Sequence, residues 1–422
     1  MMRRSAITPH ADAQPGGGDA DRSSSVSRPL AAHVEIMRLH PTRLTDFTAA
    51  RRLPPRPAAA RDADYDAKFD AETLFYDAFI GARGRIVLAG PPFLNLKDDL
   101  SRATITALPS GATCRFEVRE LDRHGQIHVE APDGTRSLRL ACPLGSVEIA
   151  VQPSEVDIFA GRRVLFTQSR NNDLAWIQDW VRFSRDIHGA DAVLIYDNGS
   201  TRYTPEELAA ALAAVSGIAA VRVVDWPYKF GPQGIDARRY WDSDFGQHGV
   251  WEHARRRFLE AAASVQGSDV DEFILTPSGR SLFEAVEAEP FGVLRYEGRW
   301  VIGVEGRDPP PGKPGRRHRD YTVTRRERPV KRLGLLTVDG DRCPPKWTLV
   351  PSRIPDRAQW KIHSIGGHLP SRWMTKDFAY RHFREISDSW KYERMGREAF
   401  DPARHEVDAL LAEHIAAVRW DV

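Results

Sequence analysis

Residues 163–200 read RVLFTQSRNNDLAWIQDWVRFSRDIHGADAVLIYDNGS, and this stretch decides the fold. It opens with an apolar run at 163–167, which predicts a strand. Residues 171–188 then place apolar side chains on one side, which predicts an amphipathic helix that Gly189 ends. A second apolar run at 192–196 predicts a buried strand. The order strand, helix, strand is typical of a crossover between parallel strands.

A second crossover follows the first. Residues 205–215 open with Pro-Glu-Glu and predict a helix, and residues 220–224 predict another strand. Asn172 or Asp173 can cap the first helix with its side chain. Two consecutive crossovers imply an α/β fold, with a mostly parallel, Rossmann-like central sheet covered by helices. In such sheets ligands bind at the carboxyl ends of the strands.

The chain before this region has a different composition. Residues 1–62 are rich in Pro, Ala, Arg, Ser and Gly, which predicts a disordered leader with one or two helical turns at the apolar patch 31–39. Residues 63–160 alternate polar and apolar side chains between turn signals, which predicts a small β-rich module, either a sandwich or a barrel. We therefore expect three parts, with the α/β domain in residues 161–422.

Composition excludes several classes of protein. The 422 residues carry 60 Lys and Arg against 58 Asp and Glu, a net charge of +2 that argues against a nucleic-acid binder. The three cysteines, Cys114, Cys142 and Cys343, are too scattered for a zinc cage or a disulfide framework. The most apolar stretch, 208–221, is shorter than the roughly 20 residues of a membrane span. With no secretory signal apparent, we expect a cytoplasmic protein without a transmembrane segment, and leave peripheral membrane contact open.

The strand at 192–196 is followed by Asp197-Asn198-Gly199-Ser200-Thr201. A carboxylate at this position can hydrogen-bond a uracil or a ribose at the ligand edge of the sheet. The alternative is a turn in which Asp197 and Asn198 bond the local backbone, and the spacing alone favours this alternative.

An acidic run, Asp269-Val270-Asp271-Glu272, precedes the apolar run 273–275. Three carboxylates in four positions repel one another unless solvent or a cation offsets their charge. In a tight turn Asp269 and Asp271 can both reach one hard cation, and Mg²⁺ or Mn²⁺ shared with substrate phosphates is the expected chemistry. A lone Asp-x-Asp occurs by chance in many chains, but this one follows two parallel crossovers.

Basic and imidazole groups gather further along the chain, at Lys346, His363, His382 and Arg384. Neutral imidazole can complete a metal shell, and Lys or Arg can hold a diphosphate. For any single histidine, an ordinary packed or surface role is the more common alternative.

Together these segments resemble the GT-A glycosyltransferases related to family 2, and most of all the family 92-like branch. The resemblance covers residues 163–397 and rests on LFTQSRNNDLAWIQDWVRFSRDIHGAD, VLIYDNGST, VVDWP, DVDEF, KWTLVP with KIHS, and the late HFR segment. The combination of YDNGS with DVDEF is the specific part. One segment departs from the family, since Arg170-Asn171-Asn172-Asp173 stands where the family often has Lys-x-Glu, with Asp173 as a shifted acidic residue.

The resemblance implies a GT-A fold and a role for each residue. Asp269, Asp271 and His363 would hold Mn²⁺ or Mg²⁺, with Asp271 as the more direct ligand. The nucleotide-sugar donor would be bound by Asp197, Asn198, Gln247, Lys346, His382 and Arg384.

The expected function is a metal-dependent, inverting transfer of a hexose from a nucleotide sugar, with a UDP-sugar as the expected donor, to a glycan or glycolipid acceptor. The acceptor hydroxyl needs a general base, and we take Glu297 first, with Glu305 and Asp320 as rivals. Glu297 could equally lie in a surface hairpin turn with Gly298. The alternative function is a non-catalytic carbohydrate-binding or scaffold protein that retains the fold. Phosphotransfer through an aspartyl nucleophile is disfavoured by Glu272 after the second Asp.

Two further features bear on the acceptor. Residues 307–332 are crowded with Arg, Pro and Gly, which predicts a mobile loop beside the acceptor or a solvated loop without function. Four tryptophans fall in or beside predicted loops, where an aromatic face can stack on a sugar: Trp226, Trp241, Trp300 and Trp373.

Overall fold

The structure of the chain is a computed structural model. It describes residues 33–233, 240, 242–310, 312–327, 329–332, 336–339, 342–387 and 397–421. Residues Ala31–Val422 form one compact unit, without a division at residue 160. The β-rich part and the α/β part therefore belong to one compact unit. Residues 1–32 of the predicted leader lie outside the described residues.

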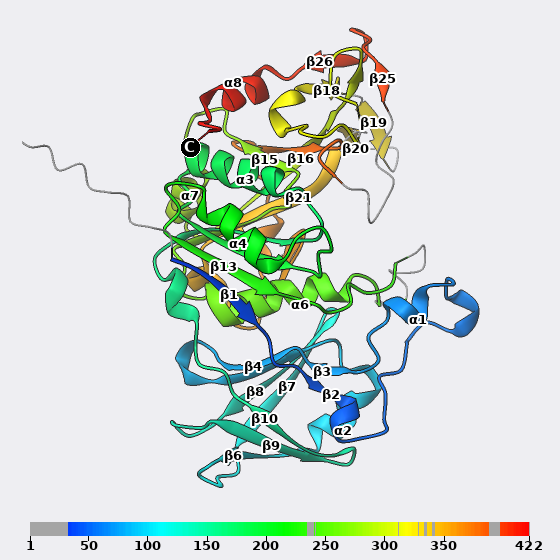
Figure 1. The fold of residues 1–422 in the computed structure, drawn as a ribbon, viewed down its shortest axis with the longest axis vertical. Coiled ribbons are helices and arrows are strands. Elements are labelled where there is room, and N and C mark those ends of the chain that lie inside the picture. The colour runs from blue at the N-terminus through cyan, green and yellow to red at the C-terminus, as the bar shows by residue number, and fades with distance from the viewer. Residues whose placement is uncertain are drawn as a thin grey trace, which may run out of the picture. The chain divides into compact units, whose positions relative to one another are not determined.

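An eleven-stranded mixed sheet organises the α/β part (Figure 1). Along its main path lie β1 (His33–Arg38), β13 (Ala220–Asp225), β12 (Ala192–Asp197), β11 (Arg163–Ser169), β14 (Ser264–Gly267), β21 (Arg342–Leu349), β16 (Val293–Ile302), β18 (Val323–Arg325) and β26 (His405–Val407). The first five strands are parallel. Off the path, β24 (Ala379–Phe383) pairs with both β15 (Glu272–Leu275) and β16. The expected α/β class, with a large parallel-rich sheet, is confirmed.

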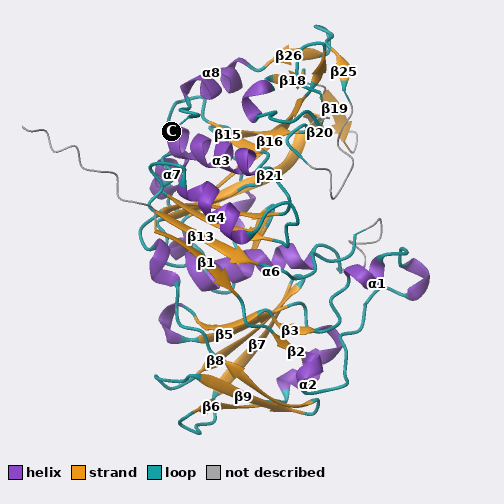
Figure 2. Ribbon diagram, viewed as in Figure 1, coloured by secondary structure: helices purple, strands orange, loops and turns teal. Residues whose placement is uncertain are grey.

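Both faces of the parallel strands are buried, because alternate side chains point to opposite sides. On one face, Leu165 and Val193 pack against α3 (Leu174–Phe183) and α4 (Pro205–Ala213). On the other face, Phe166 and Leu194 pack against α6 (Phe245–Ala254). The helices therefore form a layer on each side of the sheet (Figure 2).

The ends of the helices follow from their sequence. The Asp173 side chain accepts from the backbone N–H of Ala175 at 2.9 Å and caps α3, as predicted. Thr204 and Glu207 form a reciprocal capping box at the start of α4. The α3 helix runs on through a wider turn at Ser184–His188, and Gly189 ends it with a left-handed φ of 76°.

The N-terminal segment corrects the leader prediction. His33–Arg38 is a strand, paired in parallel with β13 at the edge of the large sheet, and not a helical turn. The alternation of its side chains explains why this segment is a strand. Val34 and Ile36 pack on the α3 side of the sheet, while Met37 packs on the α6 side. The predicted leader therefore contains ordered chain from residue 33 onward.

Two buried arginines hold the rest of this segment. Arg52 donates to the carbonyl of Pro92 at 2.7 Å and to that of Asp70 at 2.8 Å. Arg56 forms a two-pronged ion pair with Asp242 at 3.0 and 2.7 Å, and both side chains are only 1% exposed. The Pro- and Arg-rich composition concealed this order, because buried arginines of this kind depend on partners far away in the sequence.

The β-rich module consists of two antiparallel sheets that share a core. One sheet contains β4 (Asp77–Ile80), β5 (Ile86–Gly90), β8 (His124–Glu130) and β7 (Arg115–Leu121). The other contains β10 (Gly145–Ala150), β9 (Ser137–Cys142) and β6 (Thr104–Leu108). Leu88 and Ile127 of the first sheet pack in one cluster with Ile105, Leu138 and Leu140 of the second. The alternation of residues 63–160 predicted five of these strands.

A buried polar chain joins this module to the large sheet. Tyr196 of β12 donates to Nδ1 of His253 on α6 at 2.7 Å, and Nε2 of His253 donates to Asp77 of β4 at 3.1 Å. All three side chains are buried. Burial lowers the pKa of His253 against the opposing pull of Asp77, which is consistent with a neutral ring that bonds on both sides.

The remaining elements are short. They include α1 (Tyr65–Lys68), α2 (Lys97–Ser101), α7 (Leu282–Ala288), α8 (Ala409–Ala417), β22 (Gln359–Lys361) and β23 (Ser364–Gly366). Among the described residues, no helix has the length and hydropathy that crossing a lipid bilayer requires.

We predict that Asp242→Ala destabilises the protein by about 3 kcal/mol, because the buried Arg56 guanidinium loses its two-pronged partner and keeps only the half-exposed Asp62, at 3.3 Å. Tyr65 also loses its bond to Asp242, at 2.6 Å, so residues 44–68 should become sensitive to protease. Urea unfolding and limited proteolysis measure the two effects. Asp64→Ala removes an exposed pair with Lys68 and serves as the control, which should behave as the parent protein does. Equal stability of the two variants would contradict this account.

Candidate functional site

A cavity of about 550 Å³ opens at the carboxyl ends of the parallel strands. Gln168 and Ser169 border it from the end of β11, and Asn198 borders it from the end of β12. The acidic turn that precedes β15 forms another wall, together with segments from α6, β16 and β24. Six of the residues predicted from the sequence line it: Asn198, Gln247, Asp269, Asp271, His363 and His382. The topology thus brings together side chains that are far apart in the sequence.

Asp197 and Asn198 hold the strand ends in place. The Asn198 amide donates to the carbonyls of Trp226 and Tyr228 at 2.9 and 2.8 Å, and its oxygen accepts from Gln168. Asp197 is 2% exposed, accepts from the hydroxyl of Ser200, and does not line the cavity. Burial raises the pKa of Asp197. These contacts match the alternative in which Asp197 and Asn198 stabilise a local turn.

Lys346 of β21 neutralises part of the charge of the acidic turn 269–272. Its ammonium lies 2.8 Å from an oxygen of Asp269 and 3.0 Å from one of Glu272, and its side chain is 1% exposed. Burial would raise the pKa of Asp269, but Lys346 reverses the effect and holds that pKa below its ordinary value. Burial raises the pKa of Glu272 to about 7 against the same ammonium. Lys346 therefore supports the carboxylates, and does not itself line the cavity.

His382 holds Asp271. Its Nε2 lies 3.0 Å from a carboxylate oxygen of Asp271, and its ring stacks on Trp300 with centroids 4.0 Å apart and planes at 23°. The Arg384 guanidinium lies 5.0 Å from the centre of the Trp300 ring. Arg384 thus contacts the indole and does not line the cavity. His382 and Arg384 both pack on Trp300, and this packing holds in place the wall of the cavity that carries Asp271.

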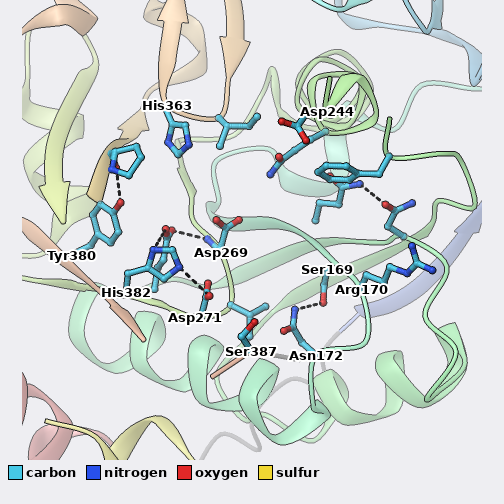
Figure 3. Close-up of a pocket in the computed structure, with 18 of the residues that line it drawn as sticks. Ser169, Arg170, Asn172, Asp244, Asp269, Asp271, His363, Tyr380, His382 and Ser387 are labelled. Atoms are coloured by element: carbon cyan, nitrogen blue, oxygen red, sulfur yellow. Dashed lines mark hydrogen bonds and ion pairs between the residues drawn. The ribbon is translucent and has the colours of Figure 1, made fainter. Parts of the chain in front are cut away.

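The predicted metal ligands share the cavity (Figure 3). Nδ1 of His363 donates to the carbonyl of Pro345 at 3.1 Å, which leaves Nε2 as an acceptor. Burial, reinforced by Lys346, lowers the pKa of His363 to about 4, so its ring is neutral at pH 7. Within the described part of the chain, no three His, Cys, Asp or Glu side chains converge on one point. Asp269 is held by Lys346, and Asp271 by His382.

The first turn of α6 supplies another wall. Gln247 and Asp244 both line the cavity, and the N–H of Gln247 donates to the carbonyl of Asp244 at 3.0 Å. Asp244 has a left-handed φ of 53°, which is uncommon for a residue other than glycine. Arg170 and Asn172 border the same space from the turn after β11 (Figure 3).

Glu297, the first choice for the general base, does not line the cavity. It lies on β16 with its side chain 39% exposed, and it forms an ion pair with Arg342. Its rivals lie outside as well: Glu305 is exposed, and Asp320 accepts from the backbone N–H of Arg317 at 2.7 Å. Among the residues that the structure describes, four carboxylates line the cavity: Asp244, Asp269, Asp271 and Glu272.

Two predictions concerned the acceptor side, namely the positions of four tryptophans and the nature of the stretch 307–332. The structure corrects both. Trp226 is fully buried in the core, because it packs between Tyr196 and Tyr228, and of the three tryptophans that the structure describes only Trp300 borders the cavity. Trp241 lies outside the described residues, and Trp373 is exposed elsewhere.

The described part of the basic stretch 307–332 is tied to the fold. Arg316 donates to the carbonyls of Glu385 and Ser387 at 2.9 and 3.2 Å, and Arg317 forms an ion pair with the buried Asp179 of α3. Arg316 and Arg317 thus bond to the protein itself, in contrast to a solvated loop.

Several cavity residues escaped the sequence reasoning. They are Arg170, Asn172, Asp244, Tyr380 and Ser387. For Arg170 and Asn172 a signal was available, because they follow the first parallel strand at its carboxyl end. The others come from segments whose approach to the sheet depends on tertiary pairing, such as β24 beside β15 and β16.

Comparisons with known proteins identify no family. No protein-family model matches the sequence, and no curated protein matches it. Among solved structures, the mannosyltransferase Ktr4p from S. cerevisiae aligns with 35% of this chain at 12% identity and a TM-score of 0.23. The alignment spans about two fifths of that protein, 41% of its chain. A likeness of this size carries no conclusion about fold or activity.

We predict that Lys346→Met lowers the free energy of unfolding by about 3–5 kcal/mol, because Asp269 and the buried Glu272 lose their shared counter-charge. Urea unfolding at pH 7.5 measures the effect. Lys68→Met, which removes an exposed lysine, should leave the midpoint unchanged. A Lys346→Met protein as stable as the parent would show that Lys346 does not support the acidic turn.

Proposed function

We propose that the protein is a glycosyltransferase that moves a hexose from a nucleotide sugar, with a UDP-sugar as the expected donor, to a glycan or glycolipid acceptor with inversion. One observation carries the proposal: Asp269 and Asp271 of one turn share a cavity at the carboxyl ends of parallel strands with two imidazoles and several amides. That edge is where α/β sheets bind their ligands. The resemblance of YDNGS and DVDEF to family motifs supports the same function.

The size and polarity of the cavity suit a nucleotide sugar. Its volume of about 550 Å³ lies within the range of small-molecule sites. Arg170 supplies a cationic group for a diphosphate, and Asn172 and Gln247 supply amides for ribose or sugar hydroxyls. Trp300 offers an aromatic edge beside the carboxylates.

The carboxylate and imidazole ligands in the cavity suit a divalent cation that also binds the substrate. Mg²⁺ and Mn²⁺ are commonly held by one or two carboxylates, with water and substrate phosphates completing the shell. Here Asp271 would be the main protein ligand, with His363 and Asp269 beside it. A protein that supplies so few ligands needs no converged group of three. When bound, the cation would neutralise the charge that develops on the leaving diphosphate.

The residues of the chain divide the remaining work. Lys346 holds Asp269, and His382 orients Asp271 through the 3.0 Å contact. The acceptor hydroxyl needs a carboxylate that faces the cavity. Asp244 meets this condition from a different element than the acidic turn, whereas Glu297 would have to leave Arg342 and move. We therefore propose Asp244 as the base, with Glu297 as the competing candidate.

A non-catalytic carbohydrate-binding or scaffold protein is the second candidate. The observation in its favour is that Asp269 is already paired with Lys346 and Asp271 with His382. Such a protein would bind glycan without a metal-dependent affinity for nucleotide.

We predict that one nucleotide sugar raises the melting temperature only when Mn²⁺ or Mg²⁺ is present. A ligand at about 100 times its Kd adds about 2.7 kcal/mol to the stability of the folded state. Thermal-shift measurements with and without metal test this. In Asp271→Asn the metal-dependent shift should disappear, because the main ligand is lost, whereas Asp377→Asn, on an exposed residue outside the cavity, should retain it. A metal-independent shift, or an undiminished one in Asp271→Asn, contradicts the metal assignment.

We predict that Asp244→Asn lowers the rate of transfer by about 10²-fold or more while the donor still binds, because general-base catalysis typically contributes about 10²–10⁴-fold. Glu297→Gln should transfer at close to the parental rate, since its side chain lies outside the cavity. Single-turnover transfer and donor affinity separate chemistry from binding. The reverse result, with Glu297→Gln inactive and Asp244→Asn active, would make Glu297 the base.

A further inference from the structure

A second cavity lies where the β-rich module meets the α/β part. Its volume is about 190 Å³, and none of its lining residues borders the first cavity. The module contributes the turn between β4 and β5, with Arg83 and Arg85, and His128 of β8. The α/β part contributes Arg256, from the turn that follows α6, and Trp360 of β22.

The charge left over in this cavity is positive. Its two acids, Glu260 and Asp356, are both bonded to Nη1 of Arg256 at 2.6 Å. Arg119, outside the cavity, also donates to Asp356 at 3.0 Å, so that carboxylate is doubly paired. Arg83 and Arg85 are exposed at the turn, and no ion pair of Arg83 occurs within the described residues. Glu130 lies 3.8 Å from Arg85, and the charge of Arg85 also contributes to the lowered pKa of Glu117.

The turn that carries these arginines has an unusual backbone. Arg83 adopts a left-handed φ of 66°, and Gly84 follows with a φ of 72°. A left-handed φ is uncommon for a residue with a side chain, and such conformations cluster at sites that hold ligands. This conformation sets the direction in which Arg83 and Arg85 leave the strand ends.

Two buried N–H donors of the lining residues have no acceptor within the described structure. One is Nε of Arg256, and the other is the indole Nε1 of Trp360. Both residues are buried, at 4% and 0% exposed. A buried donor without a partner costs about 1–3 kcal/mol. Both nitrogens are covered by neighbouring atoms, so an acceptor bound in this cavity gains their hydrogen bonds only where the covering side chains move aside. His128 adds no charge, because burial lowers its pKa to about 3.

We propose that this cavity binds an oxyanion, namely the carboxylate, phosphate or sulfate of a small anion or of an acidic glycan. Guanidinium groups match planar and tetrahedral oxyanions through paired hydrogen bonds. Arg83 and Arg85 supply the charge, while Arg256 and Trp360 line the inner wall. This site is separate from the first cavity, where we propose that the nucleotide sugar binds, so the proposal stands whether or not the protein transfers a sugar.

The indole N–H of Trp360 reports on this cavity directly. Titration of the ¹⁵N-labelled full chain with inorganic phosphate should shift that resonance saturably, and Trp360→Phe identifies it by its loss. Calorimetry with phosphate and with an oligouronate then distinguishes the two sources. Tighter binding of the oligouronate assigns an acidic glycan, and equal or tighter phosphate binding assigns a free anion. A neutral oligosaccharide of the same length should not bind.

Exposed variants keep the test independent of folding. Arg83→Gln with Arg85→Gln should weaken anion binding at least about ten-fold, as expected for the loss of charged hydrogen bonds. Arg136→Gln changes an exposed arginine of the same module outside the cavity and should bind as the parent does. A Trp360 resonance that no anion moves, or equal weakening in both variants, would overturn the proposal.

Discussion

The ammonium of Lys346, buried between Asp269 and Glu272, is the interaction on which the candidate site depends. Three carboxylates in four positions would repel one another at the floor of a cavity, and the buried ammonium keeps the pKa of Asp269 below its ordinary value there. Lys346 can reach them because β21 enters the sheet beside β14, antiparallel to it. The strand order thus sets the charge of the turn, and leaves Asp271 facing the cavity with His382 as its partner.

The β-rich module is a structural part of the α/β body. Tyr196, His253 and Asp77 form a buried chain of hydrogen bonds across the joint, while Arg56 of the N-terminal segment forms a buried ion pair with Asp242 of the α/β part. The α6 helix takes part in both regions, since its first turn borders the main cavity and its later residues contact the module. A movement of the module relative to the sheet would therefore displace Asp244 and Gln247.

Local signals in the sequence predicted the parallel strands, the capped helices and most strands of the β-rich module. They failed where long-range partners decide the outcome. The strand at His33–Arg38 lies in a segment of leader-like composition and forms because β13 is available. Spacing alone favoured a turn role for Asp197, and the structure agrees, whereas family likeness pointed to the nucleotide. The position of Lys346 beneath the turn, and of Glu297 beside Arg342, follows from strand register that local patterns do not contain.

The edge strand β1 has a consequence for synthesis on the ribosome. Glu35 bonds Arg222 of β13, its partner 187 positions later in the chain. At roughly 5–20 residues per second, the strand leaves the ribosome about 10–40 s before its partner exists. Throughout that interval it is an unpaired strand that other chains could join. Its charged residues, Glu35 and Arg38, oppose such association until β13 is made, and so protect the nascent chain from aggregation.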